Sequence, residues 1–135
     1  MTIVAGYIPT SEGLAAVDQA VRFARQEGSR LVVVNTGHHG DNAHPSFASA
    51  ADLDALRARL TDLGIQHEVR QPTGGRGAAE EILGAAAEQD AELIVIGIRR
   101  RSPVGKLITG STAQQVLLDA DCPVLAVKAP PARTG

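Results

Sequence analysis

The sequence contains very few aromatic residues. Phe, Tyr and Trp together make up 2% of its 135 residues, and Trp is absent. Proteins that bind single-stranded nucleic acid stack the bases on aromatic rings, so this composition disfavours that class. The hydrophobic core must instead be aliphatic, and the apolar fraction of 44% is large enough to build one.

We also expect no disulfide, no membrane-spanning helix and no secretory leader. Cys122 is the single cysteine, so no disulfide can form within the chain and a reducing, cytoplasmic setting is expected. Apolar runs such as residues 31–34 and 93–96 are far shorter than the roughly 20 residues of a membrane-spanning helix. Residues 1–6 lack the charged and apolar regions of a leader. We therefore expect no association with membranes.

Neither sign of charge is in clear excess. Thirteen Lys and Arg residues against fifteen Asp and Glu residues give a formal net charge of −2. A field this weak offers no general attraction to nucleic acid or to an anionic membrane, so neither is expected as a partner. Any site for an anion must be local.

The sequence does contain a regular alternation of two hydrophobic periods. Apolar residues at helical spacing, such as Leu53, Leu56 and Leu60, separate short apolar runs that predict strands. This alternation is typical of an α/β protein with a parallel sheet and helices on both faces, a three-layer sandwich. The length suits a single domain of residues 1–135 with five strands. The predicted strands are residues 2–6, 31–34, 65–70, 93–97 and 123–128.

Helix ends and faces can be predicted in the same way. Gly28 and Gly64 follow helical patterns and are expected to end those helices, because glycine adopts the left-handed conformation readily. Leu14 and Leu117 fall on the apolar stripes of the first and last helices and are predicted to face the core. Residues 129–135 have no apolar anchor and are expected to form a flexible tail.

Residues 97–112 have the pattern of an anion-binding loop. They lie between a central predicted strand and the last predicted helix, where open α/β sheets bind ligands. Gly97, Gly105 and Gly110 allow the backbone to approach a ligand closely. Ser111 and Thr112 add hydroxyl groups at the positive end of a helix. These features predict a cradle for phosphate.

Basic residues strengthen this prediction. Four positive charges fall within the same loop, on Arg99, Arg100, Arg101 and Lys106. Each feature also has an ordinary structural explanation, since the glycines can serve as turn or cap residues, Ser111 as a helix N-cap and the arginines as solvated surface. The combination favours a ligand site, because several independent anion-binding features coincide at one end of the sheet.

With these residues the chain resembles the universal stress protein family. The glycine signature of that family is Gly, two residues, Gly, nine residues, then Gly followed by Ser or Thr. Gly97 and the Gly110-Ser111 pair match its ends, whereas Arg100 stands at the second glycine. Residues 3–6, 31–34 and 122–127 are similar to family strands, so the likeness covers nearly the whole chain to Lys128. The resemblance implies the strand order 3-2-1-4-5.

The resemblance also implies a site for an adenine nucleotide, ATP or AMP, because part of the family binds such ligands. Mg²⁺ is expected only where it accompanies the nucleotide. Two residues depart from the pattern of the nucleotide binders. Ile8 stands where they carry an Asp that contacts the adenosine, and an alkyl group accepts no hydrogen bond. The Cβ of Arg100 is expected to crowd the loop, although its guanidinium can bind phosphate. The nucleotide-binding candidates are Thr10, Asn35, Thr36, Gly97, Arg99, Arg100, Gly105, Gly110, Ser111 and Thr112.

The last predicted strand is expected to join two copies of the chain. In the implied strand order it is an unpaired apolar edge, which is a template for pairing with another strand. Many family members dimerise there, so the resemblance suggests a homodimer. The predicted interface consists of Val124, Leu125, Ala126 and Val127.

Other candidate sites are weaker. His38, His39, Asp41 and His44 share one loop, but their spacing matches no zinc pattern and no metal is predicted. Cys122 is expected to be a small buried apolar residue and not a nucleophile. The glycine-rich run around Arg76 lacks the Lys-Ser or Lys-Thr ending of a P-loop, and Arg76 is a secondary candidate for reaching the ligand.

Three functional hypotheses remain open at this point. The first is a cytoplasmic universal stress protein that binds an adenine nucleotide and acts as a regulatory or sensing module. It would not be an enzyme beyond slow ATP hydrolysis, because no carboxylate in the loop is placed to activate water. The second is a nucleotide-independent dimeric interaction protein whose basic loop binds an acidic partner or a simple anion. The third, an enzyme that forms adenylates, would need a pyrophosphate-binding signature that the sequence lacks.

Overall fold

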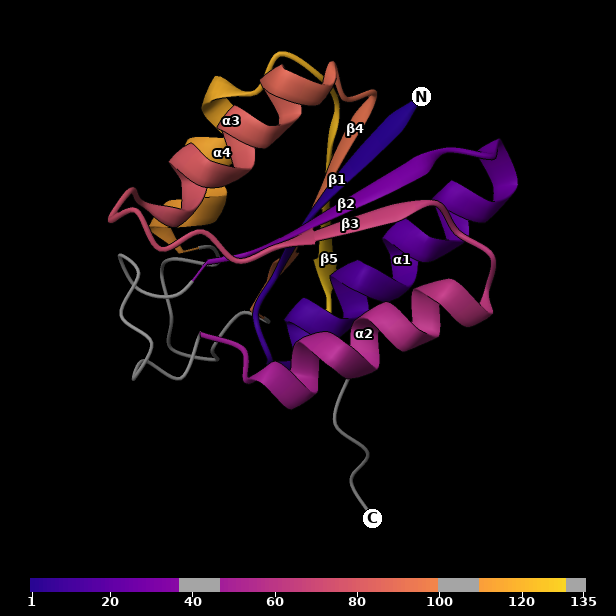
Figure 1. Ribbon diagram of the computed structural model, residues 1–135. Helices are drawn as coiled ribbons and strands as arrows, with labels where there is room; N and C mark the ends of the chain where they lie inside the picture. Colours follow the sequence, from indigo (N-terminus) through magenta and orange to yellow (C-terminus); the bar gives the residue numbers. More distant parts are fainter. Residues whose placement is uncertain (37–46, 100–109, 131–135) are drawn as a thin grey trace.

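Strands and helices alternate along the whole described part of the chain (Figure 1). The computed structural model describes residues 1–36, 47–99 and 110–130. Each strand begins and ends within two residues of its predicted bounds. The elements are β1 (Thr2–Tyr7), α1 (Ser11–Glu27), β2 (Arg30–Asn35), α2 (Ala50–Asp62), β3 (His67–Arg70), α3 (Ala78–Gln89), β4 (Leu93–Ile98), α4 (Ser111–Asp119) and β5 (Val124–Lys128).

The five strands form one parallel sheet in the order β3-β2-β1-β4-β5. This confirms the order that the family resemblance implied. Helices α1 and α2 cover one face of the sheet and α3 and α4 cover the other (Figure 1), which confirms the three-layer sandwich. The strand order reverses between β1 and β4, and parallel sheets bind ligands where such a reversal separates the carboxyl ends of two strands.

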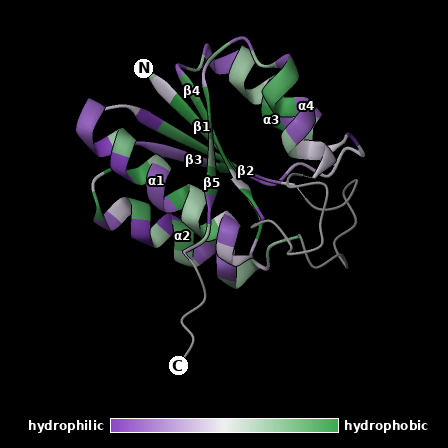
Figure 2. Ribbon diagram, turned by 180° about the vertical axis from the view of Figure 1, so that it is seen from behind, coloured by the Kyte–Doolittle hydropathy of each residue, from purple (hydrophilic) through white to green (hydrophobic). Residues whose placement is uncertain are grey.

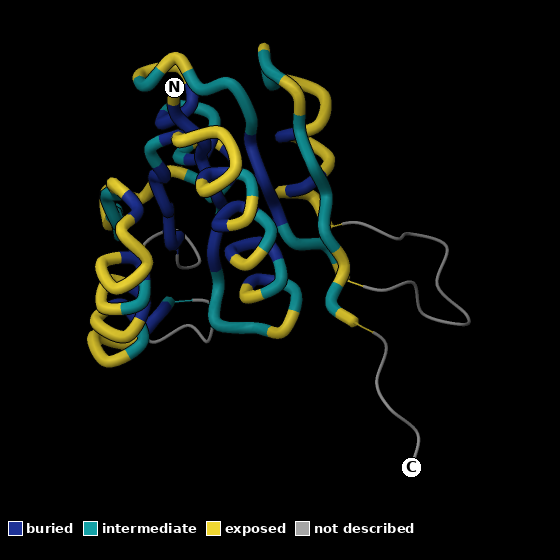
Figure 3. The backbone as a smooth tube through the Cα atoms, turned by 90° about the vertical axis from the view of Figure 1, so that its right-hand side faces the viewer, coloured by how far each residue is buried: buried dark blue, intermediate teal, exposed yellow. Residues whose placement is uncertain are grey.

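The core consists of two aliphatic layers, one on each face of the sheet. Ile3 and Val33 point toward α1 and α2, whereas Val4 and Ile94 point toward α3 and α4. Because helices cover both faces, the central strands carry continuous apolar runs, such as residues 31–34 of β2, instead of alternating with polar residues. The inner strands β1, β2 and β4 are accordingly mostly hydrophobic in Figure 2 and mostly buried in Figure 3, with polar and exposed residues on the outer sides of the helices.

Two helix ends agree with the prediction. Gly28 and Gly64 have φ angles of +67° and +71°, which lie in the left-handed region that favours glycine. No helix within the described ranges is both long and apolar enough to cross a membrane.

The prediction that Leu14 and Leu117 face the core is wrong. Leu14 is 49% exposed and Leu117 is 46% exposed. Helix α1 packs against the sheet through small residues, including Gly13 and Ala16, so its buried stripe is centred on these and Leu14 is left at the margin. Helix α4 is only nine residues long and buries Ala113 and Val116, which leaves Leu117 outside a narrow stripe.

Candidate functional site

A cleft of about 470 Å³ lies at the carboxyl edge of the sheet between β1 and β4. Its volume falls within the range of small-molecule sites, roughly 300–1,000 Å³. Its walls are largely apolar and include Ile8, Ile82 and Ile98. The cleft therefore occupies the position where the strand order reverses, and it can enclose a small molecule with an apolar part.

Three helices begin at this cleft. Residues at the amino ends of α1, α3 and α4 line it, among them Thr10, Ala78 and Gly110. The hydroxyl of Thr10 caps α1 by accepting a hydrogen bond of 3.1 Å from the Gly13 N–H. Helices α3 and α4 have glycine N-caps and no side-chain cap. Their first N–H groups and the positive ends of the helix dipoles favour an anion in the cleft.

Glycines allow α1 to pack directly against the end of β4. A Cβ on Gly97 would lie 2.3 Å from the Glu12 carbonyl oxygen, and a Cβ on Gly13 would lie 1.9 Å from the Ile8 carbonyl oxygen. Neither position can hold a side chain without displacing backbone atoms. Gly110 differs, because the nearest atom to its Cβ position is 4.0 Å away, on the Arg99 guanidinium. Gly97 is thus required for packing, whereas Gly110 leaves open space at the start of α4.

The cleft contains charges of both signs. Arg99 lines it beside the amino end of α4, and Glu12 lines it from the first turn of α1. The Glu12 carboxylate accepts a hydrogen bond of 3.3 Å from the Ser11 hydroxyl. Glu12 was not predicted from the sequence, because the acidic residue of the nucleotide binders is expected directly after the first strand and not in the first turn of the helix. An anion in this cleft is attracted by Arg99 and repelled by Glu12.

Asn35 joins the ends of three strands beside the cleft. Its Nδ2 donates to the Tyr7 carbonyl oxygen at 2.8 Å, and its Oδ1 accepts from the Ala48 N–H at 3.0 Å and from Gln71 Nε2 at 2.8 Å. The side chain of Asn35 is fully buried. The neighbouring Thr36 lines the cleft. Asn35 therefore shapes the rim, and Thr36 provides the surface that a ligand would touch.

Tyr7 and Cys122 are two titratable groups with raised pKa values. Burial raises the pKa of Tyr7, and the negative charge of Asp52 adds to the effect. Burial likewise raises the pKa of the Cys122 thiol, which packs against the α3 and α4 layer of the core. A thiol with a raised pKa carries less thiolate at neutral pH.

The structure brings six of the predicted site residues together and leaves others apart. Ser111 is the first residue of α4 and not its N-cap. Arg76 was a secondary candidate for this ligand, but it lines a different cavity on another side of α3. Arg100 and Gly105 lie outside the described residues, as do His38, His39, Asp41 and His44. The predicted residues that line the cleft are Thr10, Thr36, Gly97, Arg99, Gly110 and Thr112.

The family of the chain follows from its sequence. A sequence model of the universal stress protein family matches residues 1–128. The chain belongs to the universal stress protein family. A universal stress protein from Mycolicibacterium smegmatis is 44% identical over 126 residues, which cover 93% of this chain and 96% of that protein. Another from Thermus aquaticus is 34% identical over 135 residues, covering 94% and 98% of the two chains.

Solved structures of universal stress proteins share the fold. One from Archaeoglobus fulgidus is 31% identical with a TM-score of 0.78 and covers 95% of this chain and 98% of its own. A universal stress protein in complex with cAMP is 24% identical with a TM-score of 0.72, covering 96% and 98%. A further one from Archaeoglobus fulgidus, in complex with dAMP, is 24% identical with a TM-score of 0.63, covering 95% and 98%.

Proposed function

We propose that this universal stress protein binds an adenine nucleotide in the cleft between β1 and β4 and acts as a regulatory or sensing module in the cytoplasm. The observation that carries the proposal is that three helix amino ends and Arg99 meet in one cleft with apolar walls. Two structures of the same fold hold cAMP and dAMP. At 24% identity they share the fold alone, so the residues of this cleft carry the argument.

The phosphates would lie at the helix ends. Thr10, Ser111 and Thr112 supply hydroxyl groups there, and Arg99 supplies a positive charge. The base would contact Ile8 and Thr36, where aliphatic and backbone groups line the cleft. Because the alkyl side chain of Ile8 accepts no hydrogen bond, the ribose would be held less firmly than the phosphates. We therefore expect binding in which the phosphates dominate.

Catalysis is not part of this proposal. Among the described residues that line the cleft, Glu12 is the one carboxylate. A single carboxylate on the first turn of α1 provides neither a pair of metal ligands nor a separate base for water. ATP hydrolysis is therefore expected to be slow, with Mg²⁺ present only as the partner of the nucleotide.

A thermal-shift titration with ATP, AMP and inorganic phosphate tests the site. Saturable stabilisation by ATP and AMP is expected, reaching about 2.7 kcal/mol at a ligand concentration one hundred times the Kd. The double variant Gly110→Ala with Ser111→Ala should lose this stabilisation, because it adds a Cβ to the open space at the start of α4 and removes a hydroxyl. Gly74→Ala is the matched control, since no atom lies within 4 Å of that Cβ position. Full ATP stabilisation of the double variant would contradict the proposed site.

The same titration distinguishes nucleotide binding from the second hypothesis, in which the protein is a nucleotide-independent dimeric interaction protein. Ile8 and Glu12 favour it, because one offers no acceptor to a nucleoside and the other opposes phosphate. Stabilisation by phosphate equal to that by ATP would indicate a simple anion site. No shift with any of the three ligands would favour docking of an acidic partner.

We also propose that β5 pairs with β5 of a second copy. It is one of the two edge strands of the sheet and pairs with β4 alone within the described structure. Its residues from Val124 to Val127 are half-buried. An apolar edge strand with unpaired backbone groups is a template for an antiparallel partner.

A further inference from the structure

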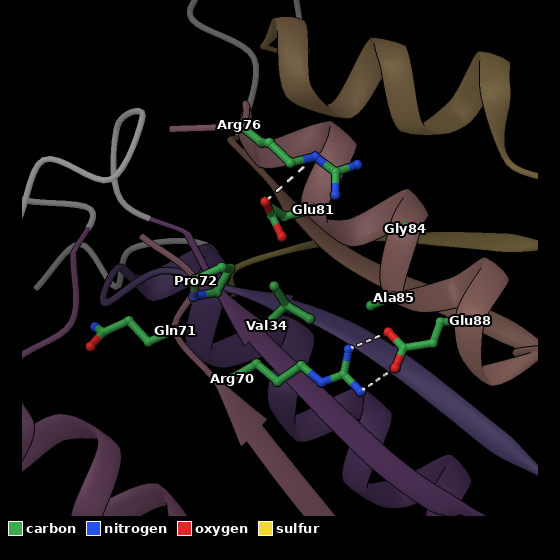
Figure 4. Close-up of a pocket in the computed structure, with 9 residues that line it drawn as sticks. All are labelled: Val34, Arg70, Gln71, Pro72, Arg76, Glu81, Gly84, Ala85 and Glu88. Atoms are coloured by element: carbon green, nitrogen blue, oxygen red, sulfur yellow. Dashed lines mark hydrogen bonds and ion pairs between the residues drawn. The ribbon is translucent and has the colours of Figure 1, made fainter. Parts of the chain in front are cut away.

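A second cavity, of about 370 Å³, lies between α3 and the carboxyl ends of β2 and β3 (Figure 4). Val34 and Ala85 form part of its lining, and both are buried. The space exists because α3 presents small residues here. A Cβ on Gly84 would lie 3.5 Å from the Arg76 guanidinium, so a larger side chain at this position would enter the hollow.

One end of the cavity is closed by a well-made ion pair. Arg70 NH1 donates to Glu88 Oε2 at 2.8 Å, and Arg70 NH2 donates to Glu88 Oε1 at 3.3 Å. Arg70 Nε also donates to Glu68. All three nitrogens of the Arg70 guanidinium therefore already contact carboxylates, whose charges oppose the approach of an anionic ligand to Arg70.

The other end carries charges that are not hydrogen-bonded to each other. Arg76 Nε lies 3.7 Å from Glu81 Oε1 and 3.9 Å from Glu80 Oε2, distances beyond a hydrogen bond. The Glu81 side chain is only 17% exposed. Within the described ranges, the Glu81 carboxylate forms its ion pair with Arg76. A carboxylate that is mostly shielded from water and forms an ion pair at 3.7 Å keeps acceptor capacity for a further donor.

The balance of charges limits what this cavity can accept. Two arginines and two glutamates line it, so a simple anion at Arg76 would meet the carboxylate of Glu81. A ligand with both an ammonium and a carboxylate group meets each charge with its opposite. The volume is near the lower end of ligand sites, which suits a molecule smaller than a nucleotide.

We propose that this cavity binds a small zwitterion of the amino-acid type. The ammonium group contacts Glu81, the carboxylate contacts Arg76, and a short apolar side chain lies over Val34 and Ala85. The site is separate from the nucleotide cleft, because the two use different residues of α3: Ala78 and Ile82 line the cleft, whereas Glu81, Gly84, Ala85 and Glu88 line this cavity.

Three matched compounds test the proposal on ¹⁵N-labelled protein by NMR. L-Leucine carries both charges, 4-methylpentanoate lacks the ammonium group, and 3-methylbutylamine lacks the carboxylate. We expect saturable shifts of the Val34, Gly84 and Ala85 amide signals with L-leucine and at least tenfold weaker binding of the other two compounds. Equal binding of 4-methylpentanoate would overturn the zwitterion assignment, and the absence of saturable shifts with L-leucine would overturn the site.

Two variants assign the charges. Arg76→Gln and Glu81→Gln should each raise the Kd for L-leucine about tenfold, which is the usual order for loss of a hydrogen bond to a charged group. Arg57→Gln, on the exposed side of α2, should leave the Kd unchanged. Unperturbed signals outside the cavity verify that each variant is folded. Binding by both cavity variants with the parent Kd would also overturn the proposal.

Discussion

Gly97 is required for packing and also belongs to the proposed nucleotide site. As a motif glycine it indicates a phosphate loop, yet the position of its Cβ is filled by the backbone of Glu12 at 2.3 Å. Gly97→Ala should therefore lower the free energy of unfolding by about 1–3 kcal/mol, the usual cost of forcing extra atoms into a packed site. Urea denaturation measures this cost. Gly74→Ala, which has open space around it, should change stability by less than about 0.5 kcal/mol. Equal midpoints for the two variants would contradict the packing role.

Glu12 has an electrostatic effect that its sequence position does not reveal. Glu12 lines the cleft together with Arg99, so its negative charge opposes the phosphates of a nucleotide. Glu12→Gln should tighten binding several-fold, and more for ATP than for AMP because ATP carries more negative charge. Isothermal calorimetry at low ionic strength measures both affinities. Glu27→Gln, at the exposed far end of α1, is the control. Weaker binding of both nucleotides by Glu12→Gln would instead assign this carboxylate to the ribose hydroxyls.

At the scale of elements, ion pairs attach the edge strand β3 to helix α3. Arg70 bonds to Glu68 on its own strand and to Glu88 on α3. Arg30 of β2 contacts Glu68 at 2.9 Å and Gln89 of α3 at 2.7 Å. The four residues of β3 contribute only Val69 to the apolar core. Polar contacts therefore hold the side of β3 that faces α3.

These ion pairs predict an acid-sensitive contribution to stability. Hydrogen bonds from Arg70 are the main reason that the pKa values of Glu68 and Glu88 lie below their ordinary value of 4.5. A carboxyl whose pKa is lower in the folded state stabilises the fold above its unfolded pKa, and this contribution is lost as pH falls from there through the folded pKa. Acidification below about pH 4.5 should therefore reduce the urea midpoint of the parent more than that of Arg70→Gln. The difference should shrink in high salt, because Glu88 is exposed.

Arg57→Gln is the control for this comparison, because its ion pair with Asp54 lies on the surface of α2. Surface pairs of this kind contribute little. Its urea midpoint should fall with pH in parallel with that of the parent. If the urea midpoint of Arg70→Gln also fell with pH in parallel with that of the parent, the role of the Arg70 contacts would be contradicted.

At the scale of the whole molecule, assembly through β5 can be tested by one backbone change. Ile94 N–H donates to the Pro123 carbonyl oxygen, so by the alternation of a strand the backbone groups of Leu125 also face β4 and those of Ala126 face outward. Ala126→Pro removes an outward N–H without removing a hydrogen bond to β4, a change that edge strands tolerate. Light scattering should give twice the 14.0 kDa chain mass for the parent and one chain mass for the variant. A parent of one chain mass at micromolar concentration would contradict the dimer.

Much of the architecture could be predicted because it depends on local pattern. Continuous apolar runs marked the central strands, and glycines marked the ends of two helices. The strand order came from the family resemblance, since hydrophobic period says nothing about which strands are neighbours. Leu14 was misplaced because its helix packs through smaller residues, whose close approach periodicity does not reveal. Glu12 and Arg76 could not be assigned to their cavities, because each cavity is lined by residues that are distant in sequence, such as Arg99 in the cleft with Glu12 and Val34 in the cavity with Arg76.

Helix α3 borders both cavities, and thermodynamics gives this shared wall a consequence. If a ligand in one cavity changes the affinity of the other cavity for its ligand by some factor, the second ligand must change the affinity for the first by the same factor. A zwitterion bound beside Glu81 would then change the affinity for a nucleotide beside Ile82, and the nucleotide would change the affinity for the zwitterion. The two sites would be coupled through one turn of α3. The Kd of each ligand can be measured with and without a saturating amount of the other. The ratio of the two Kd values must be the same for both ligands.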